Sequence, residues 1–113
     1  MSPSSKVYGL LGLARRAGGA VPGVEAVRQS VRDGRARLVV LATDASAAQL
    51  EKVERTLAGR PTPRVSFGDQ SGLGAALGLA PVSAVAVTNT AFAEQILAEL
   101  AQVSDVALTA VEG

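Results

Sequence analysis

Apolar residues recur every three or four positions in five segments of the chain, the spacing that places them on one face of an α-helix. The segments that this pattern predicts as helices are 4–17, 24–32, 46–57, 69–77 and 90–102. Four shorter segments between them carry apolar, often β-branched residues and predict strands: 20–22, 36–42, 64–67 and 84–88. The nearly unbroken apolar runs among these are typical of strands buried on both faces. Strands that alternate with helices predict an α/β/α layered domain around one small sheet.

Residues that start and stop secondary structure support these boundaries. Gly34 follows the second predicted helix and is a typical helix stop. Ser46 with Gln49 three residues later makes a capping box for the third helix, and Asp69 is suited to cap the fourth. Pro22 cannot donate a hydrogen bond to a central strand, so it marks its strand as an edge.

The length of the chain bounds its domain organisation. A chain of 113 residues, of which 48% are hydrophobic, is one domain with a real core. We expect this domain to span residues 1–104. Residues 105–113 show no clear period and are predicted to form a loose C-terminal tail.

Composition excludes several kinds of chemistry. The chain has no cysteine and no histidine, so it lacks a thiol nucleophile, a thiolate metal site and the commonest general base. We therefore expect no enzyme activity, no metal and no cofactor. No apolar stretch is long enough to span a membrane, and the start lacks the apolar core of a signal peptide. These features predict a cytoplasmic protein with no membrane partner.

Charge is distributed unevenly along the chain. Residues 1–37 hold seven Lys and Arg against two acids, a net +5, whereas residues 38–113 hold four against eight, a net −4. One interpretation is a chance partition of surface charge. The other is a basic face for an anionic partner. The second predicted helix favours the latter, because its outer face carries Arg28 and Arg32, and Arg35 follows just after the helix.

Gly23 begins this arginine-bearing helix. The first turn of any helix leaves backbone N–H groups without partners, and these groups can bind phosphate or base edges. The alternative is an ordinary solvated amphipathic helix. Residue types alone leave both interpretations open.

Three other features carry weaker signals. Gly72, Gly74 and Gly78 resemble a nucleotide-binding loop, but the spacing is wrong, and close packing of helices explains the glycines better. Asp44 follows a predicted central strand, where a turn-capping role is favoured over catalysis because no acid or base partner is near in sequence. Arg15 and Arg16 end the first helix, where they suit the helix dipole as well as a ligand.

The chain resembles the kink-turn-binding ribosomal protein family, the L-seven-Ae and L-thirty-e family, and more closely its small bacterial members. The resemblance runs from about residue 7 to residue 100. It is carried by three segments, which read GLLGLARRAGG, PGVEAVRQSVRDGRARLVVLATDAS and LGAALGLAPVSAVAVTN. The family implies an α/β/α sandwich with a mixed four-stranded sheet and about five helices. It also implies binding to kink-turn RNA, a sharply bent duplex read by its shape and its exposed base edges.

The resemblance also implies site residues, and this chain departs from several of them. The family's reading helix begins Gly-x-Asn-Glu, with a lysine three residues after the Glu. Gly23 matches the glycine, whereas Glu25, Ala26 and Gln29 stand at the Asn, Glu and Lys positions. An ionised Glu25 only accepts hydrogen bonds, so it suits an exposed base amino group but not the acceptor edge of guanine. Arg28 and Arg32 are expected to compensate for the missing lysine.

Two further segments are implied by the same resemblance. The turn after the second strand keeps the family's aspartate as Asp44, while Thr43 replaces a frequent Glu. The loop before the last strand covers bulged nucleotides in the family. The apolar residues that fit this role here are Leu79, Ala80, Pro81 and Val82.

The function expected from these residues is non-catalytic binding of structured RNA, such as ribosomal RNA or the ribosome itself. Glu25 and Gln29 would contact bases, and Arg28 and Arg32 would neutralise phosphates with help from Arg15 or Arg16. We expect a monomer and no DNA partner. The alternative is a ribosome-associated protein-interaction module with weakened RNA specificity, which the altered recognition residues and the acidic second part of the chain favour.

Overall fold

The computed structural model of the chain describes residues 2–103 and 107–109. Every predicted helix and strand is present within two residues of its expected bounds. The helices are α1 (Pro3–Arg16), α2 (Val24–Arg32), α3 (Ala47–Leu57), α4 (Gln70–Leu77) and α5 (Thr90–Leu100). The strands are β1 (Ala20–Pro22), β2 (Leu38–Leu41), β3 (Arg64–Ser66), β4 (Ala84–Val87) and β5 (Ala107–Thr109).

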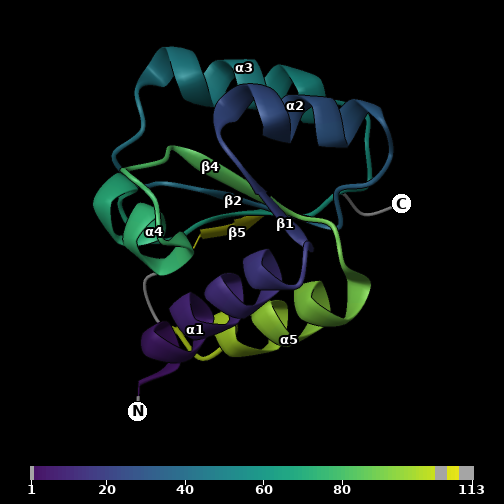
Figure 1. Cartoon of the computed structure of the whole chain (residues 1–113). Coiled ribbons are helices and arrows are strands. Elements are labelled where there is room, and N and C mark those ends of the chain that lie inside the picture. Colours follow the sequence, from purple (N-terminus) through teal and green to yellow (C-terminus); the bar gives the residue numbers. More distant parts are fainter. Residues whose placement is uncertain (1, 104–106, 110–113) are drawn as a thin grey trace.

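The strands form one mixed sheet in the order β1-β4-β2-β3-β5 (Figure 1). β2 and β3 are parallel, and the other neighbours are antiparallel. The four predicted strands are β1 to β4, and β1 lies at an edge, as Pro22 requires. The predicted mixed α/β sheet is therefore confirmed.

β5 is a fifth strand that the sequence did not predict. It pairs with the otherwise free edge of β3, with residue 108 opposite Val65. A three-residue strand is too short to show a period in the sequence, so the sequence predicts only a loose tail at this place. That expectation is corrected for 107–109, and the rest of 105–113 lies outside the described residues.

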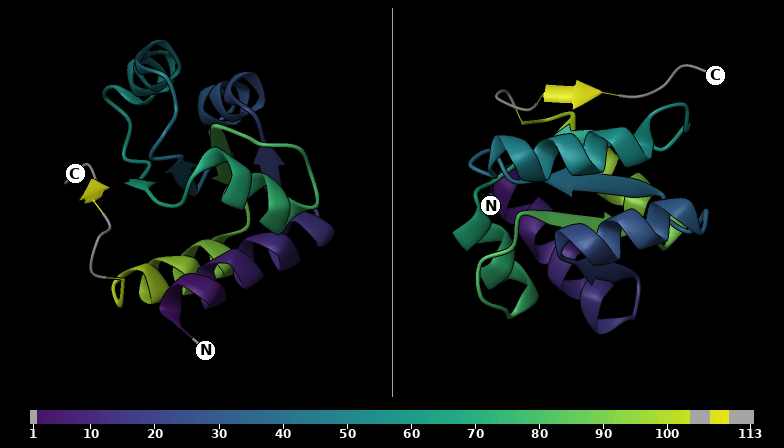
Figure 2. Two further views of the ribbon diagram at one scale, coloured as in Figure 1. Left: turned by 90° about the vertical axis from the view of Figure 1, so that its left-hand side faces the viewer. Right: turned by 90° about the horizontal axis from the view of Figure 1, so that it is seen from above.

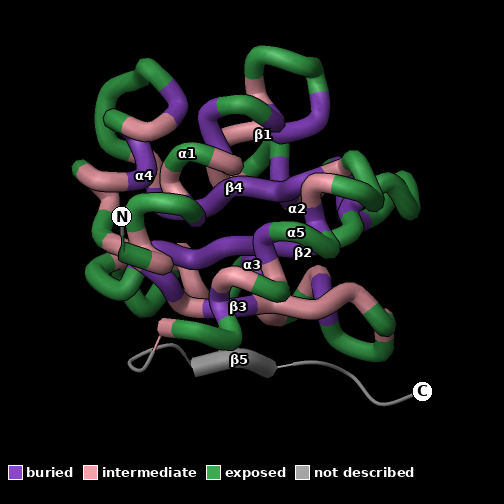
Figure 3. Tube along the Cα trace, turned by 90° about the horizontal axis from the view of Figure 1, so that it is seen from below, coloured by how far each residue is buried: buried purple, intermediate pink, exposed green. Residues whose placement is uncertain are grey.

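Helices cover both faces of the sheet and give three layers (Figures 1 and 2). α2 and α3 lie side by side on one face, over a core that includes Val31, Val39 and Leu57. α1 and α5 cover the other face over a second core, with α4 at one end. β2 and β4 are buried along their whole length between these layers (Figure 3).

One end of the sheet brings together three segments that are far apart in sequence. The N–H of Gly23 donates to the carbonyl of Ala84 across 2.8 Å, which fixes the start of α2 beside the start of β4. The N–H of Ala42 donates to the carbonyl of Ser83 across 2.9 Å, which fixes the end of β2 beside the same strand. The α2 start, the loop before β4 and the turn after β2 therefore share the end of the sheet where α4 lies (Figure 1).

Candidate functional site

The start of α2 is open. Gly23 is its N-cap residue, with φ at +99° and ψ at 146°, a conformation that only glycine adopts without strain. No side chain caps the helix at this end. The backbone N–H groups of Val24, Glu25 and Ala26 therefore lack helical acceptors. Because Glu25 and Ala26 are exposed, these donors lie at the surface.

The other helices in the described part of the chain are all capped. Side-chain oxygens of four residues accept a first-turn N–H in α1, α3, α4 and α5, namely Ser2, Ser46, Asp69 and Asn89. The predicted capping box of Ser46 and Gln49 is confirmed, and so is the cap at Asp69. α2 is the exception, since its cap position is occupied by a residue with no side chain.

An apolar loop lies beside this open helix start. Leu79, Ala80 and Pro81 are exposed, with Leu79 at 36% of its free surface, and Val82 is half-buried. The loop is fastened at both ends, because the N–H of Leu79 donates to Gly74 across 2.8 Å and that of Val82 to Gln70 across 3.1 Å. The exposed apolar residues are thus held in a defined position next to Gly23.

Thr43 and Asp44 lie in the turn between β2 and α3 and are hydrogen-bonded to the segment where α4 begins. The Asp44 carboxylate accepts the backbone N–H of Gln70 at 2.9 Å, and the Gln70 side chain donates back to the Asp44 carbonyl at 3.0 Å. The Thr43 hydroxyl donates to the carbonyl of Gly68 at 2.9 Å. The structural role predicted for Asp44 is confirmed, because its carboxylate satisfies a first-turn N–H of α4.

Ser83 is a residue of this region that sequence reasoning missed. It is buried, and its hydroxyl lies 3.0 Å from the side-chain oxygens of both Gln49 and Gln70. It therefore ties the loop before β4 to the starts of α3 and α4. A serine just before an apolar strand gives no signal in a sequence, because its partners come from two distant helices.

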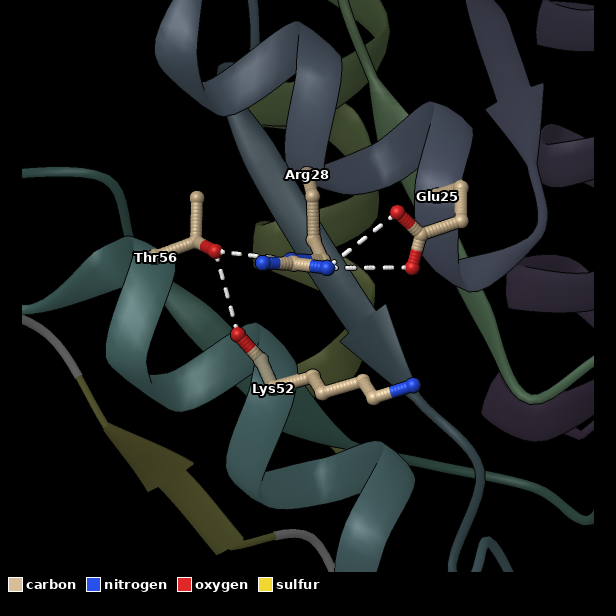
Figure 4. A network of polar contacts seen from close by, with 4 residues as sticks. All are labelled: Glu25, Arg28, Lys52 and Thr56. Atoms are coloured by element: carbon tan, nitrogen blue, oxygen red, sulfur yellow. Dashed lines mark hydrogen bonds and ion pairs between the residues drawn. The ribbon is translucent and has the colours of Figure 1, made fainter.

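Glu25 and Arg28 form an ion pair on the outer face of α2 (Figure 4). Nη1 of Arg28 lies 3.1 Å from both carboxylate oxygens of Glu25, and its Nε donates to Thr56 of α3 at 3.1 Å. The Glu25 side chain is 72% exposed, so the pair contributes only about 0.2–0.5 kcal/mol. This pairing weakens the interpretation of Glu25 as a base-reading residue, and it turns Arg28 toward α3.

Gln29 and Arg32 occupy the next turn of α2 and are both exposed. The Gln29 amide donates to Asp33 at 2.9 Å, an i,i+4 contact within the helix end. No carboxylate lies within ion-pair distance of Arg32 among the described residues. Arg32 is thus placed to meet an anionic partner, whereas Gln29 is held by a neighbour.

Arg15 and Arg16 lie at the end of α1, beside the end of α4. Nη1 of Arg15 donates to the carbonyl of Leu77 at 2.8 Å, so this guanidinium satisfies the last turn of α4. The sequence left open a role at the dipole of α1 or in ligand contact, and the contact to another helix depends on packing that a sequence does not show. Arg16 is exposed at the same place.

The glycines of α4 are explained by close packing. A Cβ atom at Gly74 would collide with the backbone of Ala80, in the apolar loop. A Cβ atom at Gly72 would lie 2.8 Å from the hydroxyl of Tyr8. The packing interpretation is confirmed, and nucleotide binding gains no support.

The described residues contain no group of three or more carboxylates that could hold a metal ion. No helix among them is both long and apolar enough to cross a membrane.

Comparison with known proteins agrees with the fold. The family model described as ribosomal protein L7Ae/L30e/S12e/Gadd45 matches residues 5–97. The chain is 34% identical over 93 residues to the RNA-binding protein YlxQ of Bacillus subtilis strain 168. The aligned region covers 82% of this chain and 93% of that protein.

Solved structures show the same architecture. A protein of unknown function from Bacillus halodurans C is similar with a TM-score of 0.80 and 29% identity, over 85% of this chain and 97% of that one. A Giardia lamblia 15.5kD RNA-binding protein is similar with a TM-score of 0.70 and 22% identity, over 87% of this chain and 83% of that one. At 22% identity the latter shows a shared fold alone.

Proposed function

Because the chain belongs to the ribosomal protein L7Ae/L30e/S12e/Gadd45 family, we propose that it binds structured RNA at the end of the sheet where α2 begins. The observation that carries this proposal is the open start of α2 beside an exposed apolar loop. The RNA in this proposal is a kink-turn or a related internal loop, in ribosomal RNA or another structured RNA. The protein acts by binding and carries out no reaction.

The open helix start supplies the polar part of recognition. Its N–H groups are fixed donors with the positive end of a helix dipole behind them, which suits phosphate oxygens and the acceptor edges of bases. Gly23 permits both the unusual backbone turn and the close approach of RNA, since it has no side chain. Backbone donors do not depend on the side chains that this chain has altered at residues 25, 26 and 29.

The loop of residues 79–82 supplies the apolar part. Internal loops in RNA present unstacked bases, and contact between their exposed faces and apolar side chains removes apolar surface from water. Leu79 and Pro81 are exposed at the right place for such contact, beside the polar donors of α2. A polar and an apolar patch side by side suit a base whose edge is hydrogen-bonded while its face is covered.

The relatives support the same proposal. The B. subtilis protein at 34% identity is named an RNA-binding protein, and it aligns with most of both chains.

A binding titration tests the proposal. Purified protein is titrated into a kink-turn RNA, with a fully paired duplex of the same length as control, at two salt concentrations. We expect binding of the kink-turn at micromolar protein or below, weaker binding of the duplex, and a steep loss of affinity with salt. Equal binding of the two RNAs would refute kink-turn recognition, and no binding of either would refute the RNA function.

A further inference from the structure

A shallow cleft, wide open to solvent and lined mainly by arginine, lies between α2 and α3. Its volume is about 580 Å³, and its lining residues are Arg28, Arg32, Arg55, Thr56 and Arg60. Two of the arginines come from α2, one from α3 and one from the turn after α3. The sequence alone does not reveal this cluster, because residues 28 and 60 meet only through the packing of the two helices.

The acids near this cleft do not balance its charge. Glu25 pairs with Arg28 at 3.1 Å, and Glu51 approaches Arg55 only to 3.9 Å. Arg32 and Arg60 have no carboxylate within ion-pair distance in the described part of the chain. Four guanidinium groups therefore share two carboxylates, and one of these acids is 72% exposed and easily displaced.

Two of the arginines are held in place by neutral partners. Nε of Arg28 donates to the Thr56 hydroxyl at 3.1 Å, while its Nη1 faces the exposed Glu25 (Figure 4). Nη1 of Arg60 donates to the carbonyl of Val31 at 2.8 Å, in the last turn of α2. These bonds orient the guanidinium groups without neutralising them. A fixed, planar guanidinium suits the bidentate contacts that phosphate accepts.

We propose that this cleft binds phosphate groups of the RNA backbone and extends the RNA-binding surface from the start of α2 along its length. The inference rests on the proposed function and adds Arg55 and Arg60 to the residues that hold the RNA. Arg28 belongs to both parts, since it lies one helical turn after the helix start. From residue 25 to residue 32 the helix rises about 10 Å, a distance that accommodates several phosphates of one strand.

Arg55 offers a test that does not disturb the fold. Its side chain is 70% exposed, and its one ion pair is long, at 3.9 Å. Lys6 on α1 is a matched control, because it is 53% exposed, also has one ion pair at 3.9 Å, and lies on the opposite layer. The variants Arg55→Gln and Lys6→Gln remove one positive charge each, so any general effect of net charge is the same in both.

The measurement is the affinity of each protein for the kink-turn RNA across a series of salt concentrations. If the cleft holds a phosphate, Arg55→Gln weakens binding several-fold and lowers the slope of log K against log salt by about 0.9, whereas Lys6→Gln leaves the slope unchanged. The double variant Arg32→Gln/Arg55→Gln is expected to lower the slope by about twice as much. Circular dichroism checks that each variant is folded.

The outcomes separate this inference from the proposed function. If the wild-type protein binds the RNA but Arg55→Gln and Lys6→Gln have equal salt slopes, the cleft does not hold a phosphate. The proposed site at the start of α2 would be unaffected by that result. No binding by the wild-type protein would overturn both. A second experiment repeats the measurement with kink-turn RNAs whose stems are shortened. If these RNAs still bind but Arg55→Gln no longer changes the salt slope, the phosphates that the cleft holds lie in a stem.

Discussion

α2 and α3 begin at the same end of the sheet and lie side by side on the same face, yet their first turns are built differently (Figure 2). α3 begins with a complete capping box, in which Ser46 accepts from the Gln49 backbone and the Gln49 side chain accepts from Ser46. α2 begins with Gly23 and no side-chain cap. One helix satisfies its own first-turn donors, and the other presents them to solvent.

In this layer, the groups that stabilise the helices therefore differ from the first-turn N–H groups of α2, which are free to bind a ligand. A glycine at the N-cap in place of a side-chain cap costs a helix about a few tenths of a kcal/mol. α2 tolerates this cost because Val27 and Val31 are buried at 0% and 1% exposure, and the hydrogen bond from Gly23 to Ala84 fixes its start. A binding site at the start of a helix requires first-turn N–H groups that no side chain caps. α2 has such groups, whereas the neighbouring α3 is capped.

The largest effect is expected from Gly23→Ala. A Cβ atom has room at this position, but the positive φ strains any residue other than glycine by about 1–3 kcal/mol. Relief of that strain shifts the first-turn donors, so we expect RNA affinity to fall at least tenfold, about 1.4 kcal/mol. Chemical denaturation and RNA titration measure the two effects.

Gly9→Ala is the matched control for this substitution. Gly9 is an exposed helical residue of α1 with open space at its Cβ position. The change is expected to stabilise the protein by about 0.5–1 kcal/mol and to leave RNA binding unchanged. Unchanged affinity in Gly23→Ala, once the folded fraction is accounted for, would mean that the start of α2 does not bind.

A smaller effect, on stability alone, is expected from Ser46→Ala. It removes the cap of α3 and should lower the free energy of unfolding by about 1 kcal/mol. RNA affinity should not change, because the donors of α3 are not part of the proposed surface. A loss of affinity as large as that of Gly23→Ala would remove the contrast between the two helices.

The smallest change in stability is expected from Glu25→Gln. The variant breaks a surface ion pair worth about 0.2–0.5 kcal/mol. It also releases Arg28 and removes a carboxylate that repels phosphate, so we expect affinity for RNA to rise several-fold. The control Glu94→Gln, at an exposed site on α5, should have no effect. Reduced affinity in Glu25→Gln would instead show that the carboxylate itself contacts a base.

The order of the elements from α1 to α5 and the three layers follow from the sequence, whereas the last strand, β5, does not. Helical spacing and turn residues are local signals, and they located α2 to within a residue. The resemblance named Gly23 and the loop of residues 79–82, which the structure places at one end of the sheet. Binding by these residues remains a prediction.

The directions in which the side chains point could not be predicted from the sequence. Arg28 turns toward Thr56 of α3, and Arg15 toward Leu77 of α4, because each meets a helix that is distant in sequence. Phe92 and Leu97 of α5 are only half-buried at the border of the core, since α5 buries Ala93 and Ile96 instead. Such outcomes depend on which helices are neighbours, and local patterns do not carry that information.

The most direct test of the central claim is an amide-detected NMR titration of the ¹⁵N-labelled protein with a kink-turn RNA. We predict that the backbone amide signals of residues 24–26 move most, together with those of residues 79, 80 and 82. The amides at the capped start of α3, residues 47–49, should stay in place, as should those of α1 and α5. Movement centred on α1 and α5, with residues 24–26 unaffected, would contradict the account.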